Sequence, residues 1–323
     1  MAVLVTGAAG FIGSHLAEAL LARGEEVVGL DNFDDFYARA VKERNLEAAR
    51  DHRRFRLVEG DIRDEAALAK LPDVDAVLHL AARAGVRPSI EHPALYSDVN
   101  VMGTARLLDL ARDRNIDTFV LASSSSVYGN NQEVPFSEAH RVDHPISPYA
   151  ATKKASELLC HTVSHLYGVT TVCLRFFTVY GPRQRPDLAI HKFARLLADG
   201  GEIPMFGDGS TSRDYTYVTD IMDGVLKAFE WARTNPGSHE VINLGESRTI
   251  TLSEMIRIIA EEMGKDPVIR RLPMQPGDVS RTYADVTKAR RLFGYDPRVE
   301  FRDGVRMFVE WLEAESRHLP VGS

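Results

Sequence analysis

The chain has few cysteines and no long hydrophobic run. Only Cys160 and Cys173 are cysteines among 323 residues, so a disulfide framework is excluded and we expect a reducing, cytoplasmic location. No apolar stretch approaches the length of a membrane-spanning helix. Because the first residues already predict a strand, we expect no signal peptide. The net charge of −7 argues against nucleic acid or an anionic membrane as a partner.

A glycine-rich turn follows the first apolar segment. Gly7, Gly10 and Gly13 lead from a predicted strand into a helix over residues 14–23. The first glycine allows a tight turn, the second lets the backbone approach a pyrophosphate, and the third lets the helix pack closely on the strand. The spacing is one residue longer than the common dinucleotide fingerprint, but its place between strand and helix predicts a dinucleotide site.

The second predicted strand ends in an acid, Asp31. A carboxylate at this point can bind both hydroxyls of the adenosine ribose and would repel a 2′-phosphate, so we predict NAD rather than NADP as the cofactor. Asp61 and Ile62 could flank the adenine, and Ala81 and Ala82 could admit the ribose. The predicted cofactor contacts are Gly7, Gly10, Phe11, Ile12, Gly13, Asp31, Asn32, Asp61, Ile62, Leu80, Ala81, Ala82, Tyr149, Lys153 and Phe176.

Four serines at residues 123–126 end an apolar run, as a buried strand does when it opens into a site. Ser147 is the predicted N-cap of the next helix, in which Tyr149 and Lys153 lie four residues apart on one face. A nearby ammonium group favours phenolate, so we expect Lys153 to lower the pKa of Tyr149. Ser124, Tyr149 and Lys153 could together remove the proton of an alcohol while hydride leaves its carbon.

Strands and helices alternate along most of the chain. We therefore predict a Rossmann-type, doubly wound parallel α/β sheet with a smaller, discontinuous C-terminal α/β substrate domain. Residues 1–178 should form the NAD-binding domain, which a strand near residues 240–245 rejoins, and residues 179–323 should bind the substrate. Residues 203–217 read as an antiparallel hairpin. Asn100, inside a predicted long helix, should bond across to a neighbouring strand.

Several arginines suit a diphosphate, namely Arg213, Arg87 and, as a further candidate, Arg271. Gln275 and Asp278 suit a ribose or a base. His161 and His165 are spaced as in metalloprotease helices, but the adjacent glutamate and a third ligand are missing, so we expect no metal.

These motifs together resemble the extended short-chain dehydrogenase/reductases that act on nucleotide sugars, over essentially the whole length. The motifs are Thr6–Gly13, the Tyr149/Lys153 pair, Ser126–Gly129, Arg213–Tyr215 and Pro276–Asp278. The resemblance implies a permanently bound NAD and a UDP-sugar substrate held by residues 179–323. It also implies a homodimer built from the helices that begin near Pro93 and Pro148.

Within that family the sequence is most similar to the UDP-glucuronate 4-epimerases, in the stretches Leu30–Tyr37, Ala122–Gly129 and Arg175–Pro182. UDP-glucose 4-epimerases usually have asparagine in place of Thr178. The 4,6-dehydratases and the UDP-glucuronate decarboxylases have an acid in place of Ser126, and without it nothing obvious protonates a departing hydroxyl.

The resemblance therefore implies conversion of UDP-glucuronate to UDP-galacturonate through a 4-keto sugar. That intermediate is a β-keto acid, so the enzyme must hold its carboxylate against loss of carbon dioxide. Ser125, Ser126 and Thr178 offer hydroxyls, and Arg185 or Arg183 offers the charge. The first alternative is a UDP-glucose or UDP-N-acetylglucosamine 4-epimerase, which would not need Arg185. A dehydratase or decarboxylase ranks after it, and a non-catalytic dinucleotide-sensing scaffold last.

Overall fold

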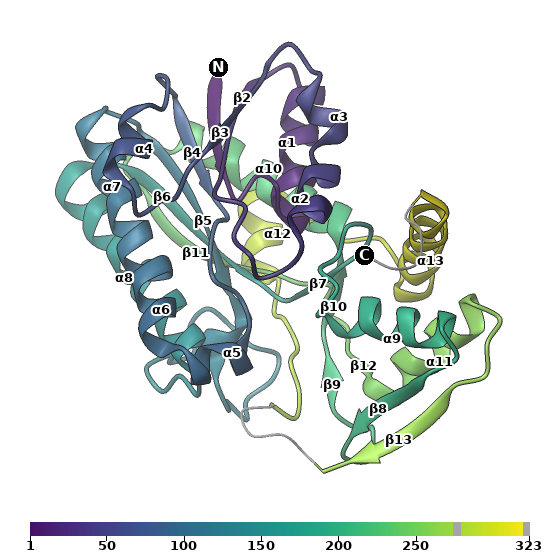
Figure 1. Cartoon of the computed structure of the whole chain (residues 1–323). Coiled ribbons are helices and arrows are strands. Elements are labelled where there is room, and N and C mark those ends of the chain that lie inside the picture. Colours follow the sequence, from purple (N-terminus) through teal and green to yellow (C-terminus); the bar gives the residue numbers. More distant parts are fainter. Residues whose placement is uncertain (274–278, 319–323) are drawn as a thin grey trace.

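A seven-stranded parallel sheet forms the centre of the computed structural model, which describes residues 1–273 and 279–318 (Figure 1). The strand order is β11-β6-β5-β4-β1-β2-β3, and all six pairings are parallel. The strands are β1 (Ala2–Thr6), β2 (Glu26–Asp31), β3 (Phe55–Glu59), β4 (Ala76–His79), β5 (Thr118–Ser124), β6 (Thr170–Phe176) and β11 (His239–Leu244). The predicted doubly wound sheet is confirmed, and the strand expected near residues 240–245 is β11.

Both faces of this sheet are covered by helices. Side chains alternate along β1, so that Val3 and Val5 join one hydrophobic core while Leu4 joins another on the opposite face. The first core is covered by α1 (Phe11–Ala22), α10 (Val218–Thr234) and α12 (Thr287–Phe293). The second is covered by α4 (Glu65–Ala69), α7 (Gly103–Asp113) and α8 (Pro148–Tyr167). The short helices α2 (Arg39–Asn45) and α3 (Glu47–Arg50) follow β2.

The remaining elements lie beyond the C-terminal edge of the sheet (Figure 1). Three small two-stranded sheets pair β7 (Thr178–Tyr180) with β10 (Tyr215–Tyr217), β9 (Ser212–Arg213) with β12 (Ile250–Thr251), and β8 (Glu202–Phe206) with β13 (Val268–Leu272). Helices α9 (Ala189–Ala198), α11 (Leu252–Glu262) and α13 (Phe301–His318) pack beside them. The antiparallel hairpin expected over residues 203–217 is wrong, because β8 pairs in parallel with the much later strand β13, with Glu202 opposite Val268.

Two returning elements connect the parts. After β10 the chain runs back as α10 against β5 and β6, and β11 then adds to the edge of the large sheet beside β6. The division into residues 1–178 and 179–323 stays a prediction. Among the described residues, no helix is long and apolar enough to span a membrane.

Asp214 ties the region after β11 to the small sheets. Its buried carboxylate accepts hydrogen bonds from the backbone N–H groups of Glu246 (2.8 Å), Ser247 (3.0 Å) and Ala284 (3.0 Å). Burial raises the pKa of Asp214 to about 6, although these hydrogen bonds act to lower it. Burial, together with Asp220 and Asp214, raises the pKa of Glu246 to about 8, and its buried Oε2 atom has no hydrogen-bond partner among the described residues.

We expect Glu246→Gln to stabilise the protein increasingly as pH rises above about 4.5, with the full gain above about pH 8. The folded state keeps a proton that the unfolded chain releases, so stability falls as pH rises from about 4.5 to about 8, and the amide removes this loss. Allowing for the partial exposure of the side chain, the melting temperature should rise by roughly 2 °C at about pH 9 and stay unchanged at about pH 5. Thermal unfolding followed by circular dichroism checks this, and an equal gain at both pH values would contradict it.

Candidate active site

A cavity of about 500 Å³ opens at the C-terminal edge of the sheet, where the chain order reverses between β1 and β4. Such a switch point is where doubly wound sheets bind their ligands. The cavity lining contains every residue that the sequence assigned to the cofactor and all three predicted catalytic residues. Ser125, Ser126, Thr178 and Arg185 line it too.

The glycine turn is packed so tightly that side chains would not fit at Gly7 or Gly13. Gly7 has a φ of +69°, and a Cβ there would lie 2.9 Å from the backbone nitrogen of Ala81. A Cβ on Gly13 would lie 2.0 Å from the carbonyl oxygen of Gly7. Helix α1 begins directly after this turn and points its free N–H groups and positive dipole end at the cavity. This cradle fits the pyrophosphate of a dinucleotide.

Asp31 ends β2 with its carboxylate already oriented. Oδ2 accepts from the backbone N–H of Ala9 (3.0 Å) and Oδ1 from that of Phe33 (2.8 Å). Burial raises the pKa of Asp31, and the Phe33 N–H acts to lower it. Next to it, Asn32 donates to Asp61 at 2.8 Å. These side chains form an acidic, polar wall of the cavity that fits a ribose without a 2′-phosphate.

Helix α8 presents the tyrosine and the lysine as the sequence predicted. The Ser147 hydroxyl accepts from the N–H of Ala150 (3.1 Å) and so caps the helix. Tyr149 is half-buried and Lys153 is buried, and the lysine Nζ lies 6.0 Å from the centre of the tyrosine ring. Nζ donates to the carbonyl oxygen of Ala122 at 2.7 Å.

The expected lowering of the Tyr149 pKa by Lys153 is wrong for this structure. Burial raises the pKa of the phenol, while a hydrogen bond from Ser124 and the charge of Arg185 act to lower it. Burial also lowers the pKa of Lys153, to about 8. The spacing of Tyr149 and Lys153 predicted where both side chains lie. It could not predict the phenol pKa, because burial by other parts of the chain dominates that pKa.

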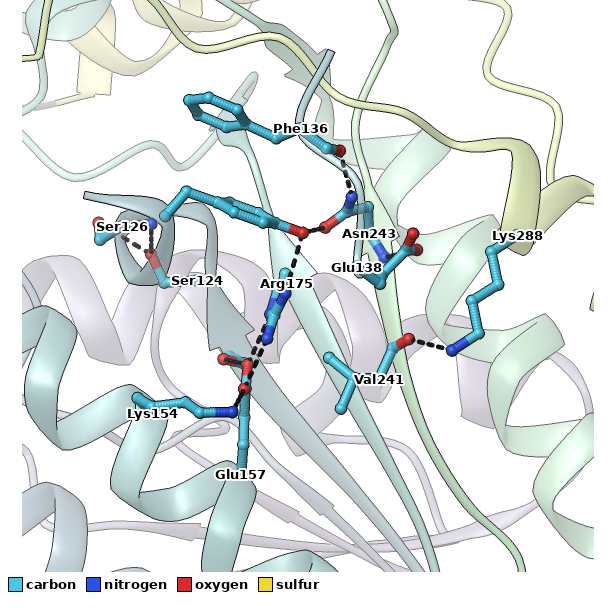
Figure 2. A network of polar contacts seen from close by, with 12 residues as sticks. Ser124, Ser126, Phe136, Glu138, Lys154, Glu157, Arg175, Val241, Asn243 and Lys288 are labelled. Carbon is cyan, nitrogen blue, oxygen red and sulfur yellow. Dashed lines mark hydrogen bonds and ion pairs between the residues drawn. The ribbon is translucent and has the colours of Figure 1, made fainter. Parts of the chain in front are cut away.

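The serines after β5 form a single turn of 3₁₀-helix, η2 (Ser125–Tyr128). The Ser124 hydroxyl caps it, accepting from the backbone N–H of Ser126 (3.2 Å) and donating to the Ser126 hydroxyl (3.1 Å) (Figure 2). Ser125 and Ser126 therefore line the cavity next to Ser124, the residue predicted to hydrogen-bond the reacting oxygen of the substrate. Thr178, at the start of β7, reaches the same cavity.

The structure separates the two arginines that the sequence could not. Arg185 lines the cavity, forms a two-pronged ion pair with Asp187 (2.9 and 2.8 Å), and is close enough to Tyr149 to act on its pKa. Arg183 instead pairs with Glu18 of helix α1 at 2.8 Å. Of these two arginines, Arg185 is therefore the one that faces the cavity near the tyrosine.

A cluster of aromatic and charged side chains in the cavity lining was not predicted from the sequence. Two guanidinium groups contact the Phe36 ring, that of Arg83 at 5.3 Å and that of Arg185 at 5.1 Å from its centroid. Arg83 also forms an ion pair with Asp34. The cavity-lining residues missed in this way are Asp34, Phe36, Tyr37, Lys42 and Arg83. The aromatic and acidic run directly after Asp31 is a sequence signal for this cluster, although by itself it indicates only the family resemblance.

Asn100 has a different role from the one expected. It lies in a π-helical turn, η1 (Asp98–Met102), between α6 (Pro93–Ser97) and α7. Its amide nitrogen donates to the carbonyl of Arg83 (3.0 Å) and to the Thr152 hydroxyl (3.0 Å), and its oxygen accepts from the N–H of Arg83 (2.8 Å). The amide thus fixes a cavity-lining loop to helix α8, and not to a neighbouring strand.

Two predicted phosphate-binding arginines lie outside this cavity lining. Arg87, in α5 (Val86–Glu91), stacks at 5.1 Å on the ring of Phe206 at the end of β8. Arg213, in β9, donates to the carbonyl of Ser212 at 2.9 Å. Gln275 and Asp278 fall outside the described residues.

The chain matches a known family over nearly its whole length. The family model described as GDP-mannose 4,6 dehydratase covers residues 4–308. A UDP-glucuronate 4-epimerase from Thermodesulfobacterium geofontis is 41% identical over 95% of this chain and 95% of its own length.

Solved structures agree in fold but differ in activity. A UDP-glucuronic acid 4-epimerase from Bacillus cereus, in complex with UDP-glucuronic acid and NAD, is 36% identical with a TM-score of 0.92, covering 98% of this chain and 100% of its own. A dTDP-glucose 4,6-dehydratase from Streptomyces venezuelae, with NAD bound, is 35% identical with a TM-score of 0.90, covering 98% of each chain. Because two different reactions match almost equally well, the reaction must be argued from the residues in the cavity.

Proposed function

The chain belongs to the GDP-mannose 4,6-dehydratase family of extended short-chain dehydrogenase/reductases, and within it we propose that the protein is an NAD-dependent UDP-glucuronate 4-epimerase. The product is UDP-galacturonate, formed through a 4-keto sugar. The observation that carries this choice is Arg185, which lines the same cavity as Tyr149 and can bind a carboxylate in two-pronged fashion.

Three residues act at the sugar 4-hydroxyl, and one of them, Tyr149, moves its proton. Bound NAD would supply the reversible hydride acceptor that carbon 4 needs. Tyr149 takes the hydroxyl proton and later gives it back, and Ser124 hydrogen-bonds the same oxygen. Lys153, anchored on the Ala122 carbonyl, places a positive charge beside the tyrosine and the nicotinamide ribose. The reaction has no net redox change.

The substrate carboxylate needs its own restraint, because the 4-keto intermediate is a β-keto acid. Arg185 supplies the charge, and Ser125, Ser126 and Thr178 supply hydroxyls around it. Ser126 puts a hydroxyl at the position from which an acid in dehydratases protonates a departing group. These features favour epimerisation over elimination.

The rest of the UDP-sugar binds beyond the cavity, in the region of residues 179–323. Arg213 and Arg87 suit the diphosphate, with Arg271 as a further candidate, and Gln275 and Asp278 suit the ribose or base. Arg87 contacts Phe206 across the two parts of the chain, which supports a substrate held between them.

Product analysis tests the proposal directly. Purified protein is incubated with UDP-glucuronate and catalytic NAD, and the nucleotide sugars are separated by chromatography. UDP-galacturonate supports the proposal. UDP-xylose, or no turnover of UDP-glucuronate together with UDP-galactose formed from UDP-glucose, would refute it in favour of a decarboxylase or of the neutral-sugar epimerase. No product from any of these substrates would favour a non-catalytic scaffold.

We also propose a cytoplasmic homodimer that joins helices α7 and α8 of two copies. Large apolar side chains are exposed along this face, with Met102 at 50%, Leu158 at 54% and Leu166 at 60% of full exposure. Both cysteines are free and buried, in keeping with a reducing compartment.

Charges placed on this face should separate the dimer. We expect the double variant Leu158→Glu and Leu166→Glu to sediment as a monomer in analytical ultracentrifugation, because two buried carboxylates per protomer cost more than such an interface supplies. Val268→Glu is a matched control, since Val268 is 57% exposed on strand β13 and should leave the dimer intact. A double variant that stays dimeric would disprove this interface.

A further inference from the structure

A buried ion pair lies behind the catalytic strand end and outside the cavity lining (Figure 2). Arg175 of β6 donates to both carboxylate oxygens of Glu157 of α8, at 2.8 and 2.9 Å, and both side chains are almost fully buried. Burial alone would raise the pKa of Glu157, but Arg175, the Ser123 hydroxyl and the charge of Lys154 together lower it. A charged pair buried this deeply is expensive unless its remaining hydrogen-bonding groups are also satisfied.

Besides Lys154 of α8, whose Nζ lies 3.2 Å from Glu157 Oε2, the groups that satisfy this pair come from both ends of one short segment. The Ser123 hydroxyl donates to Glu157 Oε1 at 2.7 Å. At the other end, the Tyr128 hydroxyl accepts from Arg175 at 3.0 Å and donates to the side-chain oxygen of Asn243 at 2.6 Å. Ser124, Ser125 and Ser126 lie between these two anchors and all three line the cavity.

Asn243 connects the Tyr128 hydroxyl to two further segments of the chain. Its amide nitrogen donates to the carbonyls of Phe136 (2.8 Å) and Asp285 (3.2 Å), and its backbone N–H donates to Glu138 (2.8 Å) (Figure 2). Tyr128 also stacks on the Phe136 ring, with centroids 4.8 Å apart. The second anchor is therefore fixed by hydrogen bonds, by a charge and by packing.

We infer that Tyr128 and Ser123 are positioning residues, held in place by the Glu157–Arg175 pair. They fix the three serines between them, and these serines keep the substrate carboxylate in an orientation from which it cannot leave as carbon dioxide. This inference rests on the proposed function. The Ser123 anchor is adjacent to Ser124, which meets the reacting oxygen. The Tyr128 anchor lies two residues from Ser126, which meets the carboxylate. Loosening Tyr128 should therefore change the fate of the intermediate more than the rate of its formation.

The side reaction is decarboxylation of the 4-keto intermediate. In the 4-keto sugar the bond between carbon 5 and the carboxylate carbon breaks, carbon dioxide leaves, and the electron pair forms the enolate of the C4 carbonyl. Carbon 5 then takes a proton from water, giving a 4-keto pentose. This step proceeds only when the breaking bond stands perpendicular to the plane of the carbonyl. A turn that holds the carboxylate near that plane suppresses it.

Tyr128→Phe tests the inference, because it removes one hydroxyl from the network and keeps the ring. With UDP-glucuronate and NAD, the ratio of carbon dioxide released to UDP-galacturonate formed should rise by about tenfold, the effect of one hydrogen bond to a charged group. Amide hydrogen exchange at residues 124–128 should become faster in the variant.

Tyr295→Phe is the matched control. Tyr295 is also fully buried and its hydroxyl makes one hydrogen bond, to the carbonyl of Gly245 at 3.1 Å. A general loss of stability would lower both products together in either variant and leave their ratio unchanged. Only a positioning role moves the ratio in Tyr128→Phe alone.

Ser123→Ala supplies the second variant if Tyr128→Phe does not fold. It releases the other anchor and should lower kcat for epimerisation by about tenfold with KM little changed. The positioning inference alone would be overturned if the wild type epimerises normally and Tyr128→Phe leaves the product ratio unchanged. An unchanged kcat in Ser123→Ala would overturn it in the same way. A wild type that forms no UDP-galacturonate would overturn the proposed function as well.

Discussion

Tyr149→Phe should lower kcat by about a thousandfold while leaving NAD bound. The phenol is the group that lies at the cavity beside Ser124 and Lys153, and phenylalanine keeps its ring and its edge-on contact with Tyr96, at 6.3 Å between centroids. Only the proton acceptor is lost, so binding of the cofactor and the substrate should change little. The measurements are single-turnover rates of UDP-galacturonate formation and the NAD content of the purified variant.

Tyr96→Phe is the appropriate comparison. Tyr96 packs against Tyr149, but its hydroxyl donates to the carbonyl of Ala84 at 2.7 Å and has no assigned part in proton transfer. Its removal should lower kcat by less than about tenfold. If Tyr149→Phe kept more than about a tenth of wild-type activity, the proton would have to leave by another group and the assignment of the base would be wrong.

The sequence predicted which residues line one side of the cavity because that side is local. Glycines that a tight turn demands, an acid at the end of the second strand, and a Tyr/Lys pair one helical turn apart are all set by spacing along the chain. The parallel sheet then brings the carboxyl ends of β1, β2, β4 and β5 to one edge. The predicted cofactor contacts therefore meet around a single cavity.

The parts that sequence reasoning missed depend on distant pairings. The turn-like residues after β8 predict a hairpin, whereas its actual partner β13 lies beyond α11. The raised pKa of Tyr149 comes from burial by elements that the Tyr/Lys spacing does not contain. Arg183 and Arg185 differ only by two positions, yet a φ of +65° at Arg183 helps to turn the chain so that one faces Glu18 and the other faces the cavity.

Arg185→Gln should lower kcat/KM for UDP-glucuronate by about a hundredfold, because a two-pronged hydrogen-bonded ion pair with the carboxylate is lost. The fold should tolerate this change. The present partner, Asp187, keeps 44% of its side-chain exposure and so does not become a buried unpaired charge. The effect belongs to binding and catalysis, and it is measured by initial rates at several UDP-glucuronate concentrations.

Two further variants isolate the role of the charge. Arg183→Gln removes a cation two positions away that pairs with Glu18, and it should change kcat/KM by less than about threefold. Arg185→Gln combined with Asp187→Asn removes both charges and should be as impaired as Arg185→Gln alone, if the loss comes from the substrate carboxylate and not from a stranded aspartate.

A pH profile completes the test. The charge of Arg185 acts to lower the pKa of Tyr149, so its removal should move the pH at which the phenol loses its proton upward, and the acid limb of kcat/KM with it. An unchanged kcat/KM for UDP-glucuronate in Arg185→Gln would show that the cavity does not recognise a carboxylate. The neutral UDP-sugar epimerase would then be the better account of this site, because its substrate has no charge for Arg185 to bind.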